Sequence, residues 1–146
     1  MREIKFRGKS MTWHYGDLIH DSCNGHELIF IDNNIERTRY SVDKDTVGQY
    51  TGRFASESAE IFEGDVLEFT VFDYQGQDVQ YRGVVEWYGS RFIVSVCLVS
   101  TSDTWRGKRD YEGDYYDLDW LLDQDDEVKI IGNIHDNPEM LRLCNA

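Results

Sequence analysis

Short apolar-rich segments separated by turn residues constrain the fold of this chain more than any other feature of its sequence. The clearest example is a hairpin, because residues 79–88 and 91–99 both fit a strand and flank the two-residue loop Gly89-Ser90. Gly64 supplies a second turn, which leads into a strand that ends near Phe72. Similar runs predict further strands at residues 4–7, 11–18, 28–31, 35–42, 47–52 and 128–134.

The first of these segments alternates between apolar and charged side chains, which is the period of a half-buried strand. We therefore expect Ile4 and Phe6 to face the core, and the opposite face to carry Lys5, Arg7 and Lys9. The second segment contains Gly16-Asp17, a dipeptide typical of turns. We therefore expect this segment to form a hairpin with the first strand and to end at that turn.

Helical signals are few and short. Residues 117–123 place three leucines on one face and predict a short helix, and the polar residues 56–60 predict one helical turn. Pro138 suits the first position of another turn, with Asn137 as its N-cap. Residues 100–113 lack periodicity and predict a loop.

These elements predict a mostly β fold, built as a small barrel or sandwich with short helical turns near the C-terminus. The chain has 146 residues, close to the usual size of one domain, so we expect a single domain over residues 1–146. The longest apolar run is far shorter than a membrane-spanning helix, and the first residues do not resemble a signal peptide. We therefore expect a cytoplasmic protein without a membrane partner.

The net charge of −13 comes from 28 acidic residues against 15 Lys and Arg. Such a chain repels phosphate backbones on average, which disfavours nucleic acid as a partner without excluding a local basic patch. Four cations fall in the first ten residues, namely Arg2, Lys5, Arg7 and Lys9. We expect this strip to serve self-association in a homo-oligomer more readily than phosphate contact.

Residues 110–127 hold nine acidic residues and neither Lys nor Arg, interleaved with Tyr111, Tyr115, Tyr116 and Trp120. The glycine and the terminal glutamate of a calcium-binding loop are missing at the required spacing, so this stretch does not predict a calcium site. Two interpretations stay open: a solvated acidic face, or a surface whose aromatic side chains dock a basic protein.

The densest set of metal-binding residue types is His14, His20, Cys23 and His26. Cys23 and His26 have the spacing of one zinc-binding pair, but His14 and His20 do not form the second pair that a zinc site needs. We therefore predict no metal and no other cofactor, and retain these four residues as weak candidates. Cys97 lies within an apolar run, which predicts a buried thiol, and the three cysteines do not suggest a disulfide framework.

Five segments together resemble the YopX family of phage and prophage proteins. In order they are Met1 to Arg7, Gln49-Tyr50-Thr51-Gly52, Ile61 to Val66, Gly83-Val84-Val85-Glu86-Trp87 and Ile131 to Glu139. The resemblance implies a small, largely β protein encoded by a bacteriophage or a prophage, with no catalytic residues to carry over. Residues 53–60 depart from the pattern, and residues 100–127 match none of it. Gly64-Asp65-Val66 and Gly83-Val84-Val85 are also similar to the first two strands of an SH3-like barrel.

The sequence lacks a nucleophile elbow, a P-loop, a dinucleotide fingerprint and a paired Cys–His signature, and His135 is a lone histidine. We therefore expect a protein of unknown activity that is not an enzyme. The favoured role is a protein-binding or assembly module whose partner is a phage protein, a host protein or a second copy of itself. The alternatives are a nucleic-acid-associated accessory protein that uses the basic strip, and an uncharacterised enzyme.

Overall fold

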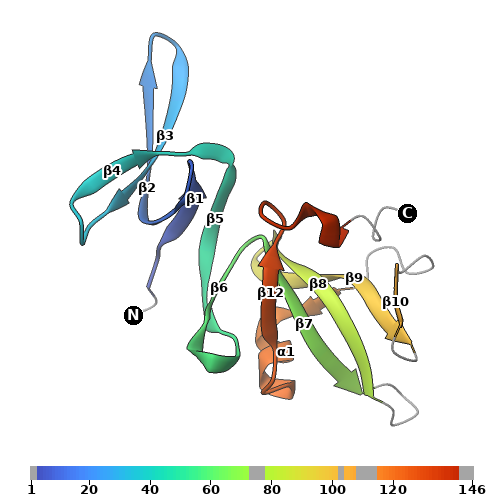
Figure 1. Ribbon diagram of the computed structural model, residues 1–146. Coiled ribbons are helices and arrows are strands. Elements are labelled where there is room, and N and C mark those ends of the chain that lie inside the picture. Colours follow the sequence, from blue (N-terminus) through green and yellow to red (C-terminus); the bar gives the residue numbers. More distant parts are fainter. Residues whose placement is uncertain (1–2, 73–77, 102–103, 108–114, 142–146) are drawn as a thin grey trace. The chain divides into compact units, whose positions relative to one another are not determined.

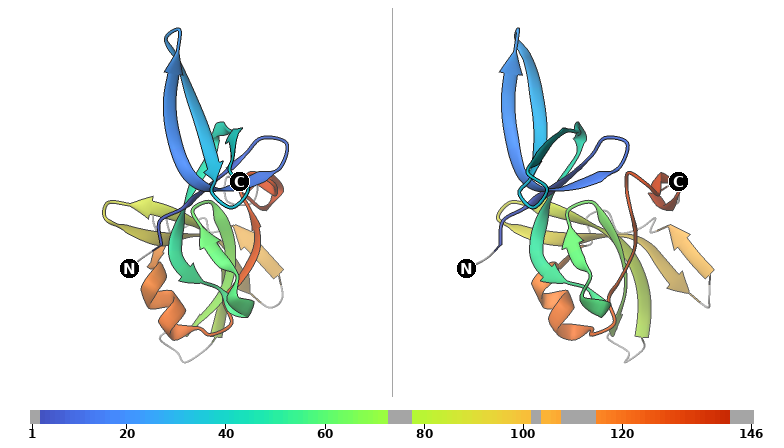
Figure 2. Two further views of the ribbon diagram at one scale, coloured as in Figure 1. Left: turned by 90° about the vertical axis from the view of Figure 1, so that its left-hand side faces the viewer. Right: turned by 60° about the vertical axis from the view of Figure 1, so that its left-hand side comes forward.

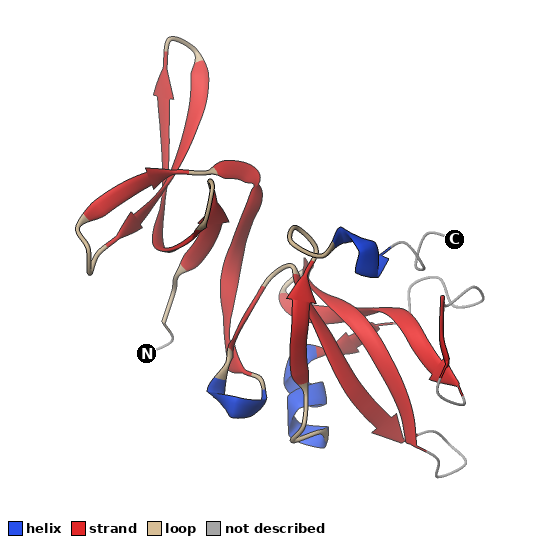
Figure 3. Cartoon of the chain, in the orientation of Figure 1, coloured by secondary structure: helices blue, strands red, loops and turns tan. Residues whose placement is uncertain are grey.

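Antiparallel strands make up most of the chain, and its helices are short (Figure 3). The computed structural model describes residues 3–72, 78–101, 104–107 and 115–141. Its strands form two antiparallel sheets, and the described strands close neither sheet into a barrel. The prediction of a mostly β fold is confirmed. None of the helices among the described residues has the length and apolar character to cross a membrane.

The chain divides into two compact units, Met1–Gly52 and Arg53–Ala146 (Figure 1). The family resemblance runs through both, with two of its five segments in the first unit and three in the second. The expectation of a single domain over residues 1–146 stays a prediction.

The first unit holds five strands of a sheet with the order β4-β3-β2-β1-β5-β6, where β6 is Glu60–Phe62, and these five strands are joined mostly by short turns. Its strands are β1 (Phe6–Lys9), β2 (Trp13–Cys23), β3 (His26–Asn33), β4 (Thr38–Ser41) and β5 (Asp43–Phe54), whose last two residues belong to the second unit. The predicted hairpin between the first two strands is confirmed, because β1 and β2 pair antiparallel. The prediction for residues 35–42 is wrong at its start, since Ile35 lies in the exposed turn before β4.

Gly16-Asp17 is not a turn, because β2 runs through both residues to Cys23. Gly16 pairs with Phe6 of β1, and its φ of 156° brings the backbone against β3. A Cβ at this position would overlap the carbonyl oxygen of Asp32 and lie 2.8 Å from its carbon. Glycine is therefore required here for a close approach of two strands, which is the other common reason for a glycine within a strand.

The turn that ends β2 is Asn24-Gly25. Both residues have positive φ, 51° and 79°, as a two-residue hairpin turn of type I′ requires. Seven residue pairs join β2 and β3, from Asp17 opposite Asp32 to Cys23 opposite His26. The end of this hairpin extends beyond the other strands of the first unit (Figure 2).

The burial of β1 differs from its predicted pattern. Ile4 is 61% exposed and precedes the strand, whereas Arg7 is only 5% exposed. Gly8 takes the place of an apolar side chain on the other face, where a Cβ would lie 2.7 Å from Cγ2 of Val42. The expectation that Ile4 faces the core is therefore wrong. The cations do share one face, since Arg7 and Lys9 both lie over the ring of Trp13.

The second unit contains the remaining elements, with the sheet order β10-β9-β8-β7-β12 and β11 paired to β9. They are η1 (Ser56–Ser58), β6 (Glu60–Phe62), β7 (Asp65–Phe72), β8 (Asp78–Tyr88), β9 (Arg91–Thr101), β10 (Thr104–Gly107), β11 (Tyr115–Asp117), α1 (Leu118–Gln124), β12 (Lys129–Asn133) and η2 (Pro138–Leu141). The predicted hairpin at Gly89-Ser90, the helical turns and the final strand are confirmed. The predicted loop over residues 100–113 is wrong where β9 continues and β10 forms.

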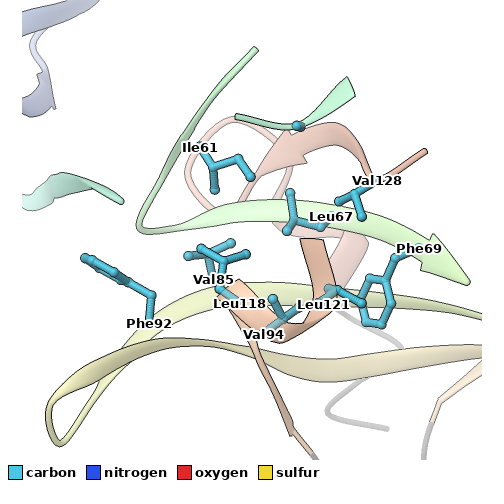
Figure 4. Packing of buried hydrophobic residues seen from close by; sticks show 10 residues of the cluster. Ile61, Leu67, Phe69, Val85, Phe92, Val94, Leu118, Leu121 and Val128 are labelled. Carbon is cyan, nitrogen blue, oxygen red and sulfur yellow. The ribbon is translucent and has the colours of Figure 1, made fainter. Parts of the chain in front are cut away.

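Side chains from the sheet and from α1 form the core of the second unit (Figure 4). Leu118 and Leu121 of α1 are buried against Leu67, Val85 and Val94 of the sheet. This is the packing expected of a helix with one apolar face. The core therefore holds α1 against the sheet and sets which residues of β11 and α1 reach solvent.

Candidate interaction surfaces

The negative charge of the protein lies almost entirely on the second unit. The first unit has seven Lys and Arg against eight acidic residues, a net charge of −1, and the second has eight against twenty, a net charge of −12. These values add to the −13 of the whole chain. A partner that binds the second unit therefore meets a strongly anionic body.

Exposed tyrosines lie on the outer face of the second sheet, by which we mean the face opposite to Val85 and Val94. Tyr88 ends β8 and is 61% exposed, and Tyr115 begins β11 and is 43% exposed. Their ring centroids are 5.8 Å apart. Arg91, opposite Tyr88 in the β8–β9 register, lies over the Tyr115 ring at 5.6 Å, and its Nη1 is 3.2 Å from Oδ2 of Asp117. We call Tyr88, Arg91, Tyr115 and Asp117 the Tyr88–Tyr115 surface.

On the same face of β8 and β9, the polar side chains of Glu86 and Ser95 are opposite Ile93 and Val84, which are buried. The hydroxyl of Ser95 donates to Oε2 of Glu86 at 2.6 Å, and Ser95 is opposite Tyr115 in the β9–β11 register. Successive side chains of a strand alternate between faces, so Glu86 and Tyr88 share the outer face, whereas Val85 points into the core. The outer face thus combines a carboxylate, a hydroxyl and two exposed aromatic rings with the buried side chains of Val84 and Ile93.

The structure separates the aromatic residues that the sequence grouped together. Tyr115 is on the outer face, whereas Tyr116 packs against the core, with its ring centroid 5.8 Å from that of Phe69. Trp120 of α1 is 44% exposed and stacks on Tyr116, with centroids 5.7 Å apart and planes 10° apart. Tyr111 lies outside the described residues. The described members of the predicted set, Tyr115, Tyr116 and Trp120, therefore do not form one continuous surface.

The acidic side chains of α1 have local structural roles. Oδ1 of Asp117 accepts the backbone N–H of Trp120 at 3.1 Å and caps the helix. Asp119 and Asp123, one turn apart, both contact the guanidinium of Arg53, at 2.8 Å and 3.3 Å. These exposed ion pairs contribute little to stability. They place the guanidinium of Arg53 between two carboxylates of the acidic helix.

The basic strip of the first unit lies against aromatic rings. Lys5 Nζ is 5.0 Å from the centroid of Tyr50, and Arg7 Cζ is 4.7 Å from that of Trp13. Because Arg7 is buried, it does not offer its guanidinium to a partner, whereas Lys5 and Lys9 are partly exposed. Arg2 lies outside the described residues. Among its described residues, the strip thus presents Lys5 and Lys9, but not Arg7, at the surface.

Of the four metal-ligand candidates, Cys23 and His26 are opposite each other in the β2–β3 register, whereas His14 and His20 lie elsewhere along β2. His14 stacks on Tyr40 with centroids 3.8 Å apart, and the hydroxyl of Tyr40 donates to Glu36 at 2.6 Å, a hydrogen bond that raises the pKa of Tyr40. His20 Nδ1 is 3.4 Å from Glu27 Oε1. Over residues 3–72, 78–101, 104–107 and 115–141, the structure brings together no three His, Cys, Asp or Glu residues in a group that could hold a metal.

Three of the five segments that carry the family resemblance meet in the second unit. The N–H of Gly64 donates to the carbonyl of Val85 at 2.9 Å, and its own carbonyl accepts the N–H of Ile134 at 3.0 Å. The buried carboxylate of Asp65 accepts the N–H of Phe62 at 2.8 Å, and Asn133 Oδ1 accepts the N–H groups of His135 and Asp136. These side chains hold turns in place, so their described contacts explain the fold and assign no chemistry.

Tyr88 and Arg91 are the surface residues that sequence reasoning missed. The signal was present, because both flank the Gly89-Ser90 turn and directly opposite residues in a hairpin share a face. Their meeting with Tyr115 depends on the pairing of β11 with β9, which joins segments about 20 residues apart in the chain.

The strands and surfaces define a mostly β protein that presents exposed aromatic rings on an acidic unit. A model of the family described as YopX protein matches residues 5–142, and the chain belongs to this family. Comparison with curated proteins finds no match. Among solved structures, protein EF1440 from Enterococcus faecalis is similar, with 20% identity, a TM-score of 0.44, and coverage of 97% of this chain and 100% of that one.

Proposed function

We propose that this chain is a phage- or prophage-encoded protein-binding or assembly module that acts in the bacterial cytoplasm without catalysing a reaction. Membership of the YopX family supports the phage or prophage origin. The observation that carries the binding role is the Tyr88–Tyr115 surface on the acidic second unit.

Tyrosine is well suited to this role because its ring buries a large area while its hydroxyl stays hydrogen-bonded. Interfaces are enriched in Tyr, Trp and Arg, and few such residues supply most of the binding energy. Tyr88, Tyr115 and Arg91 form such a group, held in register by strands β8, β9 and β11. The charge of −12 on the second unit favours a partner with a cationic surface and speeds its association.

Replacing Tyr88 or Tyr115 by alanine is expected to weaken partner binding without unfolding the chain, since both rings are exposed. The full chain serves as bait in host cells that express it, captured proteins are identified by mass spectrometry, and affinities are measured with the purified partner. A central tyrosine contributes about 2 kcal/mol, so each variant should raise the Kd by about 30-fold.

Phe72→Ala is the matched control, because Phe72 is an exposed aromatic residue too, at 72%, but lies where β7 meets the opposite end of β8, beside Asp78. This variant should leave the Kd within about twofold. Equal affinities for the native chain and both tyrosine variants would exclude the Tyr88–Tyr115 surface as the binding site. An equal loss in Phe72→Ala would show that the effect is not local.

The nucleic-acid alternative has weaker support, because Arg7 is buried and Lys5 and Lys9 lie on aromatic rings. We expect fluorescence anisotropy to detect no saturable binding of DNA or RNA between about 50 and 200 mM salt, since phosphate contact requires several accessible cations. Salt-dependent binding that is lost in a Lys5→Ala, Lys9→Ala variant would overturn this expectation.

A further inference from the structure

The end of the β2–β3 hairpin places a cysteine and a histidine side by side. Cys23 and His26 are directly opposite each other and flank the turn formed by Asn24 and Gly25. Directly opposite residues of an antiparallel pair share a face, with Cβ atoms about 4.5–5.5 Å apart. Both residues are exposed, and Cys23 is a free thiol.

This arrangement matches half of a zinc site. Structural zinc takes four thiolate or imidazole ligands in a tetrahedron, usually as two pairs that are each close in sequence, with Zn–S near about 2.3 Å. Cys23 and His26 supply one such pair across a tight turn, with both side chains on the same face of the hairpin. The part of the chain that the structure describes holds no third residue to complete the set within one copy.

The nearest other histidine belongs to the opposite face of the hairpin. His20 pairs with Ile29 and lies diagonally beside Glu27, to which its Nδ1 is 3.4 Å. Because strand side chains alternate between faces, His20 and Cys23 point to opposite sides. The missing ligands must therefore come from outside this hairpin, and a second copy offers an identical pair.

We propose that two copies of this chain bind one zinc ion between their hairpin ends, each copy contributing the Cys23 thiolate and the His26 imidazole. A two-fold arrangement uses the same residues of both copies and completes a Cys₂His₂ tetrahedron. Both residues are exposed, and the end of the hairpin extends beyond the other strands of the first unit (Figure 2). Binding releases the two thiol protons to solvent. The prediction of no metal considered one chain alone, whereas this site needs two.

The test uses the full chain, stripped of metal and kept reduced so that a Cys23 disulfide cannot form. Zinc is then added, and the mass is measured by light scattering together with the zinc bound per chain. We expect the mass to double, with one zinc per two chains. Cobalt in place of zinc should give the absorption of a tetrahedral site with thiolate ligands. Cys23→Ser and His26→Ala should each keep the monomer mass at the same zinc concentration.

Matched controls exist for both ligands. His20→Ala, on the opposite face of the hairpin, and Cys97→Ser, on β9, should both retain the zinc-dependent doubling. Cys144→Ser, outside the described residues, should retain it as well. An unchanged mass on zinc addition would overturn the proposal, as would a doubling that survives in Cys23→Ser or is lost in Cys144→Ser. Tyr88→Ala should still dimerise with zinc, which separates this site from the proposed partner surface.

Discussion

Replacing Gly16 by alanine is expected to destabilise the first unit by about 3 kcal/mol. The added Cβ would overlap the carbonyl oxygen of Asp32, a backbone atom that cannot rotate away, at a φ of 156° that L-residues rarely adopt. Backbone strain and overpacking each cost about 1–3 kcal/mol. Because whole domains are stable by only about 5–15 kcal/mol, a loss of this size is readily measured.

Urea unfolding followed by tryptophan fluorescence measures the loss, and amide hydrogen exchange of peptides from β2 and β3 locates it. Gly25→Ala is the matched control, because Gly25 also has positive φ but a Cβ there would meet no atom within 4 Å. Gly25→Ala should cost about 1 kcal/mol, the penalty of the left-handed backbone alone. Equal stabilities for the two variants would show that the close approach to Asp32 relaxes at little cost.

Replacing Leu121 by alanine is expected to destabilise the second unit by about 3 kcal/mol. Leu121 is fully buried where α1 meets the sheet, and truncating such a leucine costs about 2–5 kcal/mol through lost burial and the cavity left behind. The same variant should loosen α1, whose N-cap is Asp117, a member of the Tyr88–Tyr115 surface. We therefore expect weaker partner binding as well as lower stability.

Leu122→Ala provides the comparison within the same helix, because the neighbouring leucine is only partly buried. Its truncation should cost about 1 kcal/mol and leave partner affinity near the native value. The midpoint of urea unfolding reports the stability of both variants. A cost at Leu122 that matches the cost at Leu121 would contradict the packing of α1 seen in the structure.

Local sequence signals predicted those elements whose conformation depends on neighbouring residues. Gly89-Ser90 forms the predicted hairpin turn, with Gly89 at a φ of 67°, and Gly64, at 93°, turns the chain into β7. Residues 117–123 form α1 almost as predicted, because the N-cap Asp117 and the leucine spacing act within one or two helical turns. For such elements the fold and the local pattern require the same residues.

A glycine signal, by contrast, has more than one physical meaning. Gly16-Asp17 looks like a turn but lies within β2, whereas Asn24-Gly25, the stronger type I′ signal, forms the actual turn. The close approach of β2 and β3 at Asp32 explains Gly16, and no local pattern contains that contact. Weighing the two dipeptides by the turn type that each allows would have placed the hairpin correctly.

In the candidate surfaces, too, some features follow from the local sequence and others depend on tertiary contacts. The sequence predicted one face with Lys5, Arg7 and Lys9. It also predicted four candidate docking residues, namely Tyr111, Tyr115, Tyr116 and Trp120. The burial of Arg7 and the separation of Tyr116 from Tyr115 follow from which face of each strand meets the core. Alternation of side chains along a strand predicts that its two faces differ. It does not predict which face packs against the core.

The segmented strand pattern by itself determined that this protein is mostly β, because alternation and turn chemistry act over a few residues and survive in any tertiary arrangement. Only the tertiary structure decided which strands pair and which side chains this pairing brings together. It paired β11 with β9, so that Tyr88, Arg91 and Tyr115 meet, and it carried β2 through Gly16, so that Cys23 and His26 lie together at the end of the hairpin. The physical reason is that strand pairing joins residues distant in the chain, and its register depends on long-range packing.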